Sequence, residues 1–182
     1  SEVDRIKEEV RKLLEEHHKR NEDIVREVTR LLEEHHKKNE EVVRESEKLV
    51  KKIREILRDR VRDEDKVRDL ERRVERLNRE TRRELTESSE EARELVKRVT
   101  DELRKSSKEL TDVVRDVERL LDEGRGDERV LEEARKVVRE LNRRSEELLK
   151  RARELVERLD RKSEELLRKS ERIIKKIEED IR

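Results

Sequence analysis

Histidine is the residue type in this chain best suited to acid–base or ligand chemistry, and it occurs in two adjacent pairs. Residues 13–30 read LLEEHHKRNEDIVREVTR and residues 31–48 read LLEEHHKKNEEVVRESEK, so the segment repeats and His17-His18 recurs as His35-His36. Near neutral pH an imidazole donates one hydrogen bond, accepts another and titrates at about pH 6.5. These pairs could therefore bind a metal, assist a nucleophile or form buried hydrogen bonds.

The spacing of the histidines argues against a metal site. A single helix ligates a metal through residues three or four positions apart, whereas these histidines are adjacent. The chain has no cysteine, so thiolate ligands, cysteine nucleophiles and disulfides are excluded together. We expect no metal and no cofactor.

Catalysis is the second possibility for the histidines. Serines and acidic residues abound, so a Ser-His-acid arrangement can be drawn from the sequence. Long helices, however, offer no strained nucleophile turn, oxyanion hole or cleft. We expect the chain not to be an enzyme.

One tripeptide, Arg125-Gly126-Asp127, matches the integrin-recognition sequence. Three residues match often by chance. Here a glycine that stops one helix and an aspartate that caps the next explain the same letters without adhesion.

The composition restricts the class of protein and its partners. Charged residues make up 58% of the chain and hydrophobic residues 29%, which would suggest disorder if the apolar residues were not periodic. Lys plus Arg equals Asp plus Glu at 53 each, so no net charge favours nucleic acid or anionic lipid. We expect a soluble protein with no membrane segment, targeting signal or small-molecule ligand, made by recombinant cytoplasmic expression; its natural location stays unknown.

The repeat predicts long helices, because its length equals five turns of an undistorted α-helix and so returns each side chain to the same face. Gly124, Gly126 and Asp127 predict one turn, and a shift of the apolar stripe predicts another near residues 61–64, with Asp63 or Asp65 as the cap. The predicted fold is all-α, an up-down-up bundle of three long, nearly straight antiparallel helices in a single domain over residues 1–182. The predicted helices span residues 3–60, 64–122 and 128–181.

Short turns place polar residues of neighbouring helices at the same level. The residue numbers of two facing positions should add up to about 124 in the first two helices and to about 250 in the last two. This register sets the histidine pairs opposite serine pairs and Ser46 opposite Asn78, and it predicts three polar layers in an aliphatic core. The predicted members are His17, His18, His35, His36, Asn21, Asn39, Ser46, Asn78, Ser88, Ser89, Ser106, Ser107, Ser145, Ser163 and Ser170.

The repeats, the paired serines and the charged surface together resemble a known class of protein. With its LLEEHHKRN and LLEEHHKKN repeats, its paired serines and its Glu/Lys/Arg surface, the chain resembles a de novo designed helical bundle with programmed buried hydrogen-bond networks. The resemblance implies a structural or assembly scaffold without natural biochemical activity, whose polar layers specify register and association, with a second copy as partner. Two alternatives stay open: a three-helix component of a designed heterocomplex that binds a helical partner chain, and a pH-responsive switch built on the histidines.

The switch alternative makes a prediction about titration. Burial against hydroxyl groups should lower the pKa of His17 and of His35 below about 6.5. Nearby glutamates could instead raise the pKa of His18 and of His36.

Overall fold

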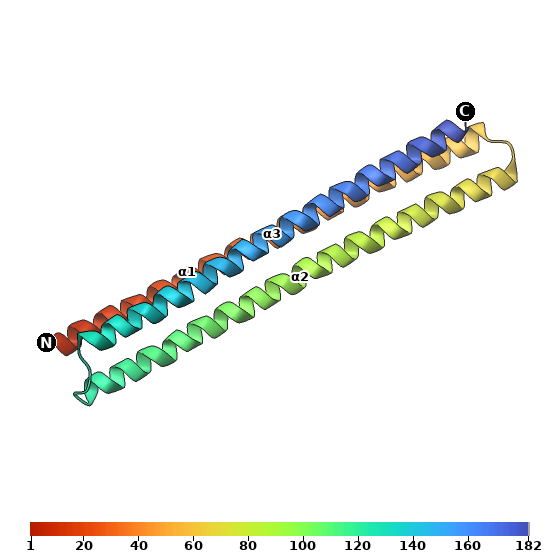
Figure 1. The fold of residues 1–182 in the computed structure, drawn as a ribbon. Helices are drawn as coiled ribbons and strands as arrows, with labels where there is room; N and C mark the ends of the chain where they lie inside the picture. The colour runs from red at the N-terminus through yellow and green to blue at the C-terminus, as the bar shows by residue number, and fades with distance from the viewer. Residues whose placement is uncertain (182) are drawn as a thin grey trace. The chain divides into compact units, whose positions relative to one another are not determined.

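A computed structural model describes residues 1–181 of the chain. Within that range the chain forms three helices and no strand: α1 (Glu2–Arg60), α2 (Glu64–Asp122) and α3 (Glu128–Ile181) (Figure 1). The all-α class is confirmed, and each predicted helix end agrees with the structure or differs from it by a single position. None of these helices is apolar enough along its length to cross a membrane.

The first turn covers residues 61–63, and its cap is Asp63 rather than Asp65. The Asp63 Oδ1 atom accepts hydrogen bonds from the backbone N–H groups of Asp65, at 3.1 Å, and Lys66, at 3.3 Å. These bonds satisfy two of the amides that the first turn of a helix leaves without a partner. Asp65 lies inside α2, with its carboxylate 3.7 Å from Arg68.

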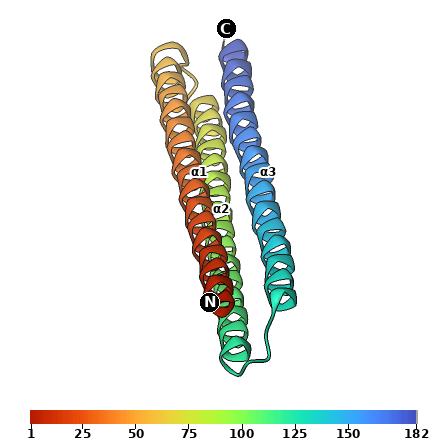
Figure 2. The same cartoon turned by 90° about the vertical axis from the view of Figure 1, so that its left-hand side faces the viewer.

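The second turn, seen from another side in Figure 2, ends α2 on a glycine. Gly124 has φ of 71°, a left-handed conformation that side chains disfavour. The Gly124 N–H donates to the Leu121 carbonyl at 3.1 Å, and the Arg125 N–H donates to that of Leu120 at 2.9 Å. This is a Schellman end. Asp127 then accepts a bond from the Arg129 N–H at 2.9 Å, so the Arg-Gly-Asp tripeptide forms a helix end and a helix cap.

The chain divides into two compact units, and each helix contributes a segment to both. Unit 1 comprises Ser1–Arg30 and Glu94–Glu154, and unit 2 comprises Leu31–Arg93 and the chain from Leu155 onward. The prediction of one domain over the whole chain stays a prediction.

Within each unit the α1 and α3 segments run in the same direction and the α2 segment runs opposite to both. In unit 1, Asn21 of α1 bonds Leu103 of α2 and Ser145 of α3. In unit 2, Asn39, which lies one repeat later, bonds Leu85 and Ser163. Inside unit 1, the α2 partner moves back from Asp122 for Lys7 to Leu103 for Asn21, and the α3 partner moves forward from Arg135 for Glu9 to Ser145 for Asn21. Inside unit 2, the α2 partner moves back from Ser88 for His35 to Arg82 for Glu47, and the α3 partner moves forward from Asp160 for His35 to Ser163 for Asn39. The up-down-up order is confirmed inside each unit.

The cores of both units are aliphatic, as the restricted alphabet predicts. Burying one such side chain is worth about 1.5–3 kcal/mol, so these clusters supply the main favourable term in folding. In unit 1 the buried apolar residues include Ile6, Val10, Ile24, Val28, Val99, Leu103, Leu110, Leu131, Leu141 and Ala152. In unit 2 they include Val50, Ile53, Leu57, Leu70, Val74, Leu77, Ile174 and Ile177.

Candidate functional site

Unit 1 contains a buried layer of hydrogen-bonded polar side chains around His17, which is 1% exposed. The His17 Nδ1 atom lies 2.7 Å from Asn142 Oδ1 of α3, and Nε2 lies 2.8 Å from Ser106 Oγ of α2. One ring therefore links all the helical segments of the unit. We call this set layer 1; its members are His17, Asn21, Ser106, Ser107, Asn142 and Ser145.

Asn21 ties the rest of layer 1 together. Its amide nitrogen donates to Ser107 Oγ at 3.0 Å and to the Leu103 carbonyl at 3.2 Å, and it lies 3.2 Å from His17 Nε2. Its Oδ1 atom accepts a bond from Ser145 Oγ at 2.8 Å. The asparagine thus uses both its donor and its acceptor groups inside the unit.

Unit 2 contains the equivalent layer around His35, which is fully buried. The ring lies 2.8 Å from Ser88 Oγ and 2.7 Å from a carboxylate oxygen, Asp160 Oδ1. Asn39 donates to Ser89 Oγ at 2.8 Å and accepts from Ser163 Oγ at 2.6 Å. We call this set layer 2; its members are His35, Asn39, Ser88, Ser89, Asp160 and Ser163.

The contacts fix the tautomer of each neutral ring. The Nδ1 atom of each ring faces an oxygen that can only accept, Asn142 Oδ1 or Asp160 Oδ1, so the ring proton sits on Nδ1 and Nε2 accepts. His17 then donates from Nδ1 to the Asn142 amide oxygen, and His35 donates to the Asp160 carboxylate. The serine hydroxyls donate to Nε2 in return. Each neutral imidazole is thereby satisfied on both nitrogens, which burial requires.

The predicted pairings of the histidines with serines are confirmed for the inner rings, His17 with Ser106 and His35 with Ser88. The second serine of each pair, Ser107 or Ser89, bonds the asparagine instead of the outer histidine. Ser145 and Ser163 join the layers at the predicted levels.

The connections of Ser88, His35 and Asp160 are those of a catalytic triad, with a serine on Nε2 and a carboxylate on Nδ1. Ser88 is 2% exposed, however, and lines none of the grooves described below. A nucleophile must reach its substrate, and Ser88 is covered in this structure.

The role of the chain has to be argued from the geometry of its layers, because comparison with known proteins gives no match. The chain matches no protein-family model and no curated protein. Among residues 1–181, no group of three or more His, Cys, Asp or Glu side chains is arranged to hold a metal ion.

The outer histidines are half-buried beside the layers. Thr111 Oγ1 lies 3.5 Å from His18 Nε2 and donates to the Ser107 carbonyl at 2.9 Å. The ring of His36 lies 6.4 Å from that of His35. Burial, then the charge of Arg93, lowers the pKa of His36 despite the opposing effect of Glu40. Glu40 does act to raise the pKa of His36, as suggested, but it offsets only part of the lowering by burial and Arg93.

Burial also lowers the pKa of His17, as predicted. The hydrogen bond to Asn142 opposes this shift, and the nearby charges of His18 and Arg20 add to it. A proton on His17 would place a charge in a buried site with no carboxylate against the ring.

The third predicted layer is wrong in its pairing. Ser46 Oγ is buried and has no hydrogen-bond partner among the described residues, and Asn78 is half-buried with no bond to it. At this level Thr81 Oγ1 of α2 instead lies 3.3 Å from Ser170 Oγ of α3. The register is right to within a turn, but Asn78 lies three positions from the stripe residue that faces Ser170.

Sequence reasoning missed Asn142, Asp160 and Thr81. Thr81 is a polar residue on the apolar stripe of α2, between Leu77 and Leu85, which is the signal that identified Ser88. Asn142 and Asp160 are one repeat apart, and each lies three positions before a layer serine. That shared repeat position was a usable signal.

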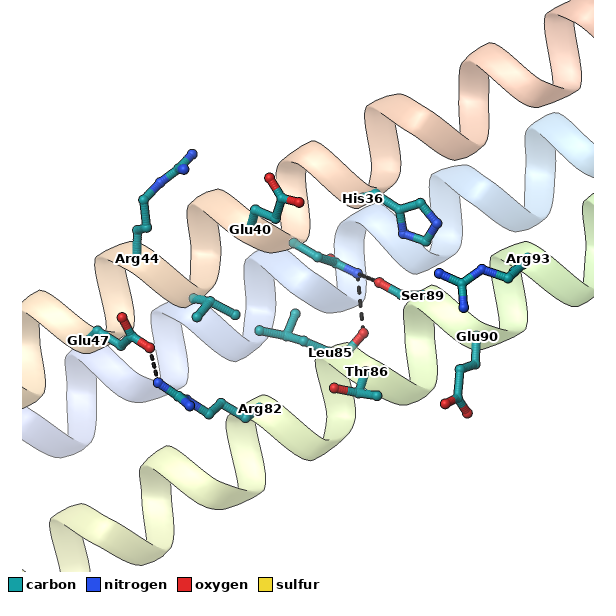
Figure 3. A pocket seen from close by; sticks show the side chains of 12 residues that line it. His36, Glu40, Arg44, Glu47, Arg82, Leu85, Thr86, Ser89, Glu90 and Arg93 are labelled. Carbon is teal, nitrogen blue, oxygen red and sulfur yellow. Dashed lines mark hydrogen bonds and ion pairs between the residues drawn. The ribbon is translucent and has the colours of Figure 1, made fainter.

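Each unit also has a groove between α1 and α2, above the exposed edge of its layer. In unit 2 the groove encloses about 720 Å³, and its lining includes the apolar Val43 and Asn39 of the layer. Leu85 and Ser89 line it from α2 (Figure 3). The Glu47–Arg82 ion pair lies at one end. In unit 1 the groove encloses about 590 Å³, with Val25, Leu103, Asn21 and Ser107. The linings recur with the period of the sequence repeat.

Proposed function

We propose that this chain is a de novo designed helical-bundle scaffold whose buried histidine layers specify helix register and association. The observation that carries the proposal is that each unit holds a complete layer, with the same inner bonds, contributed by all of its helical segments. Such layers add little to net stability, since burial of polar groups offsets the bonds they form. Their use is to penalise alternative helix registers and alternative modes of association.

The layers penalise a shift of α2 along its own axis. Sliding α2 by one helical turn would set Leu103 or Leu110 opposite His17, and a ring with an unsatisfied nitrogen costs about 1–3 kcal/mol. Sliding it by the full repeat would pair His17 with Ser88 but bring Leu70 opposite His35. Only one register satisfies both rings.

A variant without layers tests this proposal. In it, the layer histidines and asparagines become Leu and the layer serines become Ala. The parent should give one species by size exclusion with light scattering and one set of amide resonances. The variant should keep its helix content but populate more than one oligomeric state or more than one set of resonances. Ser46→Ala is the control, because Ser46 has no partner. A layer-free variant with a single, unchanged species would contradict the proposal.

A second candidate function is supported by the grooves. In each groove, valine, leucine and uncharged polar groups lie among charged side chains, such as Glu40 and Arg93 in unit 2. An apolar strip with a charged rim is the arrangement of a helix-binding surface. A pair of antiparallel helices presents a groove that fits one more helix. We propose that this partner is an amphipathic helix, aliphatic toward Val43 or Val25, with an amide side chain toward the layer.

Binding of helical peptides with these features, measured by fluorescence anisotropy, tests the second candidate. Val43→Arg should weaken binding at least tenfold by placing a charge in the groove. The matched control, Leu166→Arg, puts the same charge on a half-buried position of α3 that lines neither groove, and it should bind as the parent does. Equal effects of both variants, or self-association of the chain through Val43, would contradict the heterocomplex.

A further inference from the structure

Layers 1 and 2 match position by position except at the ends of their hydrogen-bond chains. His17 Nδ1 donates to an amide, Asn142, whereas His35 Nδ1 donates to a carboxylate, Asp160, at the same 2.7 Å. The outer histidine of layer 1 faces the neutral Thr111, and the residue one repeat earlier in α2 is Arg93, beside His36. The layers therefore share one core of bonds and differ in charge.

The difference matters when a proton is added. A proton on Nε2 removes the acceptor that the serine hydroxyl uses, and the serine must turn to accept instead. In layer 2 the resulting imidazolium lies against Asp160 and forms an ion pair. In layer 1 it lies against a neutral amide while 1% exposed. An unpaired buried charge is strongly disfavoured, and a paired one much less so.

We infer that the layers take up protons in a fixed order, His35 before His17, so that layer 2 tolerates acid while layer 1 resists it until unit 1 opens. This goes beyond the proposed function, because it concerns protonation inside each unit and requires no partner helix. The lowered pKa of His17 agrees with it independently of the comparison between layers.

The ion pairs between α1 and α3 beside the rings do not explain the difference. On α1, Arg20 lies three positions after His17 and Lys38 three after His35, and they pair with Glu146 and Glu164 of α3 in the same way. On α2, Ser106 and Ser88 are equivalent.

The neighbour of each ring along α1 is the same in both layers, whereas the charges on α2 differ. His18 follows His17 and His36 follows His35, so this like-charge neighbour is common to both layers. On α2, Arg93 and Arg82 of unit 2 correspond to Thr111 and Thr100 of unit 1, and Glu90 corresponds to Lys108. Arg93 lies beside His36, and as a cation it opposes protonation there. Asp160 must therefore outweigh it for the inferred order to hold.

Ring nitrogen NMR of the intact chain, titrated from neutral to acid pH, tests the order. The signals are assigned with single His→Gln variants. His17 should keep the neutral pattern at a pH where His35 already shows the imidazolium pattern, because only His35 has a carboxylate against the ring. Asn142→Asp should make His17 titrate like His35, and Asp160→Asn should make His35 titrate like His17.

The isosteric exchange keeps the volume of the site, so packing is held constant. If Asn142→Asp fails to fold, Asp160→Asn alone decides the matter, because His35 must then lose its precedence over His17. Rings that titrate together in the parent, or an order that neither exchange moves, would overturn the inference. Arg93→Thr is the second control, and it should widen the separation between the rings rather than abolish it.

Discussion

At the residue scale, the contribution of a buried polar side chain depends on whether it has a partner. Ser163 and Ser46 are both buried serines in unit 2. Ser163 Oγ donates to Asn39 Oδ1 at 2.6 Å, whereas Ser46 Oγ has no partner in the described chain. A buried hydroxyl without a bond keeps its desolvation penalty and gains nothing in exchange.

These serines give opposite predictions for the same substitution. Ser163→Ala should lower the free energy of unfolding by about 1–3 kcal/mol, because it leaves the Asn39 oxygen unsatisfied. Ser46→Ala should leave it unchanged or raise it by about 1 kcal/mol, because only an unpaired hydroxyl is removed. Chemical denaturation followed by circular dichroism measures both. Equal losses in the two variants would show that Ser46 has a partner after all.

The pH dependence follows from His17. Its pKa is lowered in the folded state, so the unfolded chain binds the proton more readily. The contribution of His17 to the free energy of unfolding is therefore fully present above about pH 6.5. It declines as the pH falls from there through the lowered pKa, by about 1.4 kcal/mol for each unit by which the folded pKa lies below the unfolded pKa.

His17→Gln removes that titration and should reduce the loss of unfolding free energy between about pH 7.5 and about pH 5. Carboxylates contribute equally in parent and variant, so the difference between the two isolates the imidazole. An unchanged pH response in the variant would assign the acid sensitivity to the carboxylates.

At the scale of the helices, short local signals decide where each one begins and ends. The Asp63 carboxylate caps α2 through two amides, and Gly124 ends it through a left-handed turn. Between these ends, the aliphatic stripe and the period of the repeat keep one face of the helix buried.

The first cap can be tested against its neighbour. Asp63→Ala should destabilise the chain by about 0.5–2 kcal/mol, because two amides lose their acceptor. Asp65→Ala changes an exposed carboxylate inside the helix, opposite Arg68, and should cost only a few tenths of a kcal/mol. Thermal unfolding of the two variants makes the comparison, and a larger effect at Asp65 would contradict the cap assignment.

At the scale of the whole molecule, each unit has its own layer, and the hydrogen bonds of layer 1 and those of layer 2 have no residue in common. Groups that share no partner contribute additively to stability, whereas members of one network are coupled. The arrangement therefore predicts which pairs of substitutions interact.

Double-mutant cycles measure this. Asn21→Ala and Asn39→Ala, one in each layer, should add to within about 0.5 kcal/mol. Asn21→Ala and Ser145→Ala, which remove the two ends of one hydrogen bond, should show a coupling of about 0.5–3 kcal/mol. Strong coupling between Asn21 and Asn39 would mean that the layers respond as one network.

The sequence alone determined the features that are encoded locally or by repetition. The helix boundaries follow from caps, glycines and stripe periodicity, and the pairing of His17 with Ser106 follows from counting residues away from a short turn. Both need only distances along the chain and the pitch of a helix.

Only the tertiary structure decided which side chains at the edge of a stripe turn inward. Counting gives the level of a residue to within a turn, but a contact also depends on the rotation of each helix about its axis, which the packing of all neighbouring side chains sets. That rotation brings Asp160 against His35 and Asn142 against His17, and it sets Thr81 instead of Asn78 opposite Ser170. The same rotation leaves Ser46 buried without a partner.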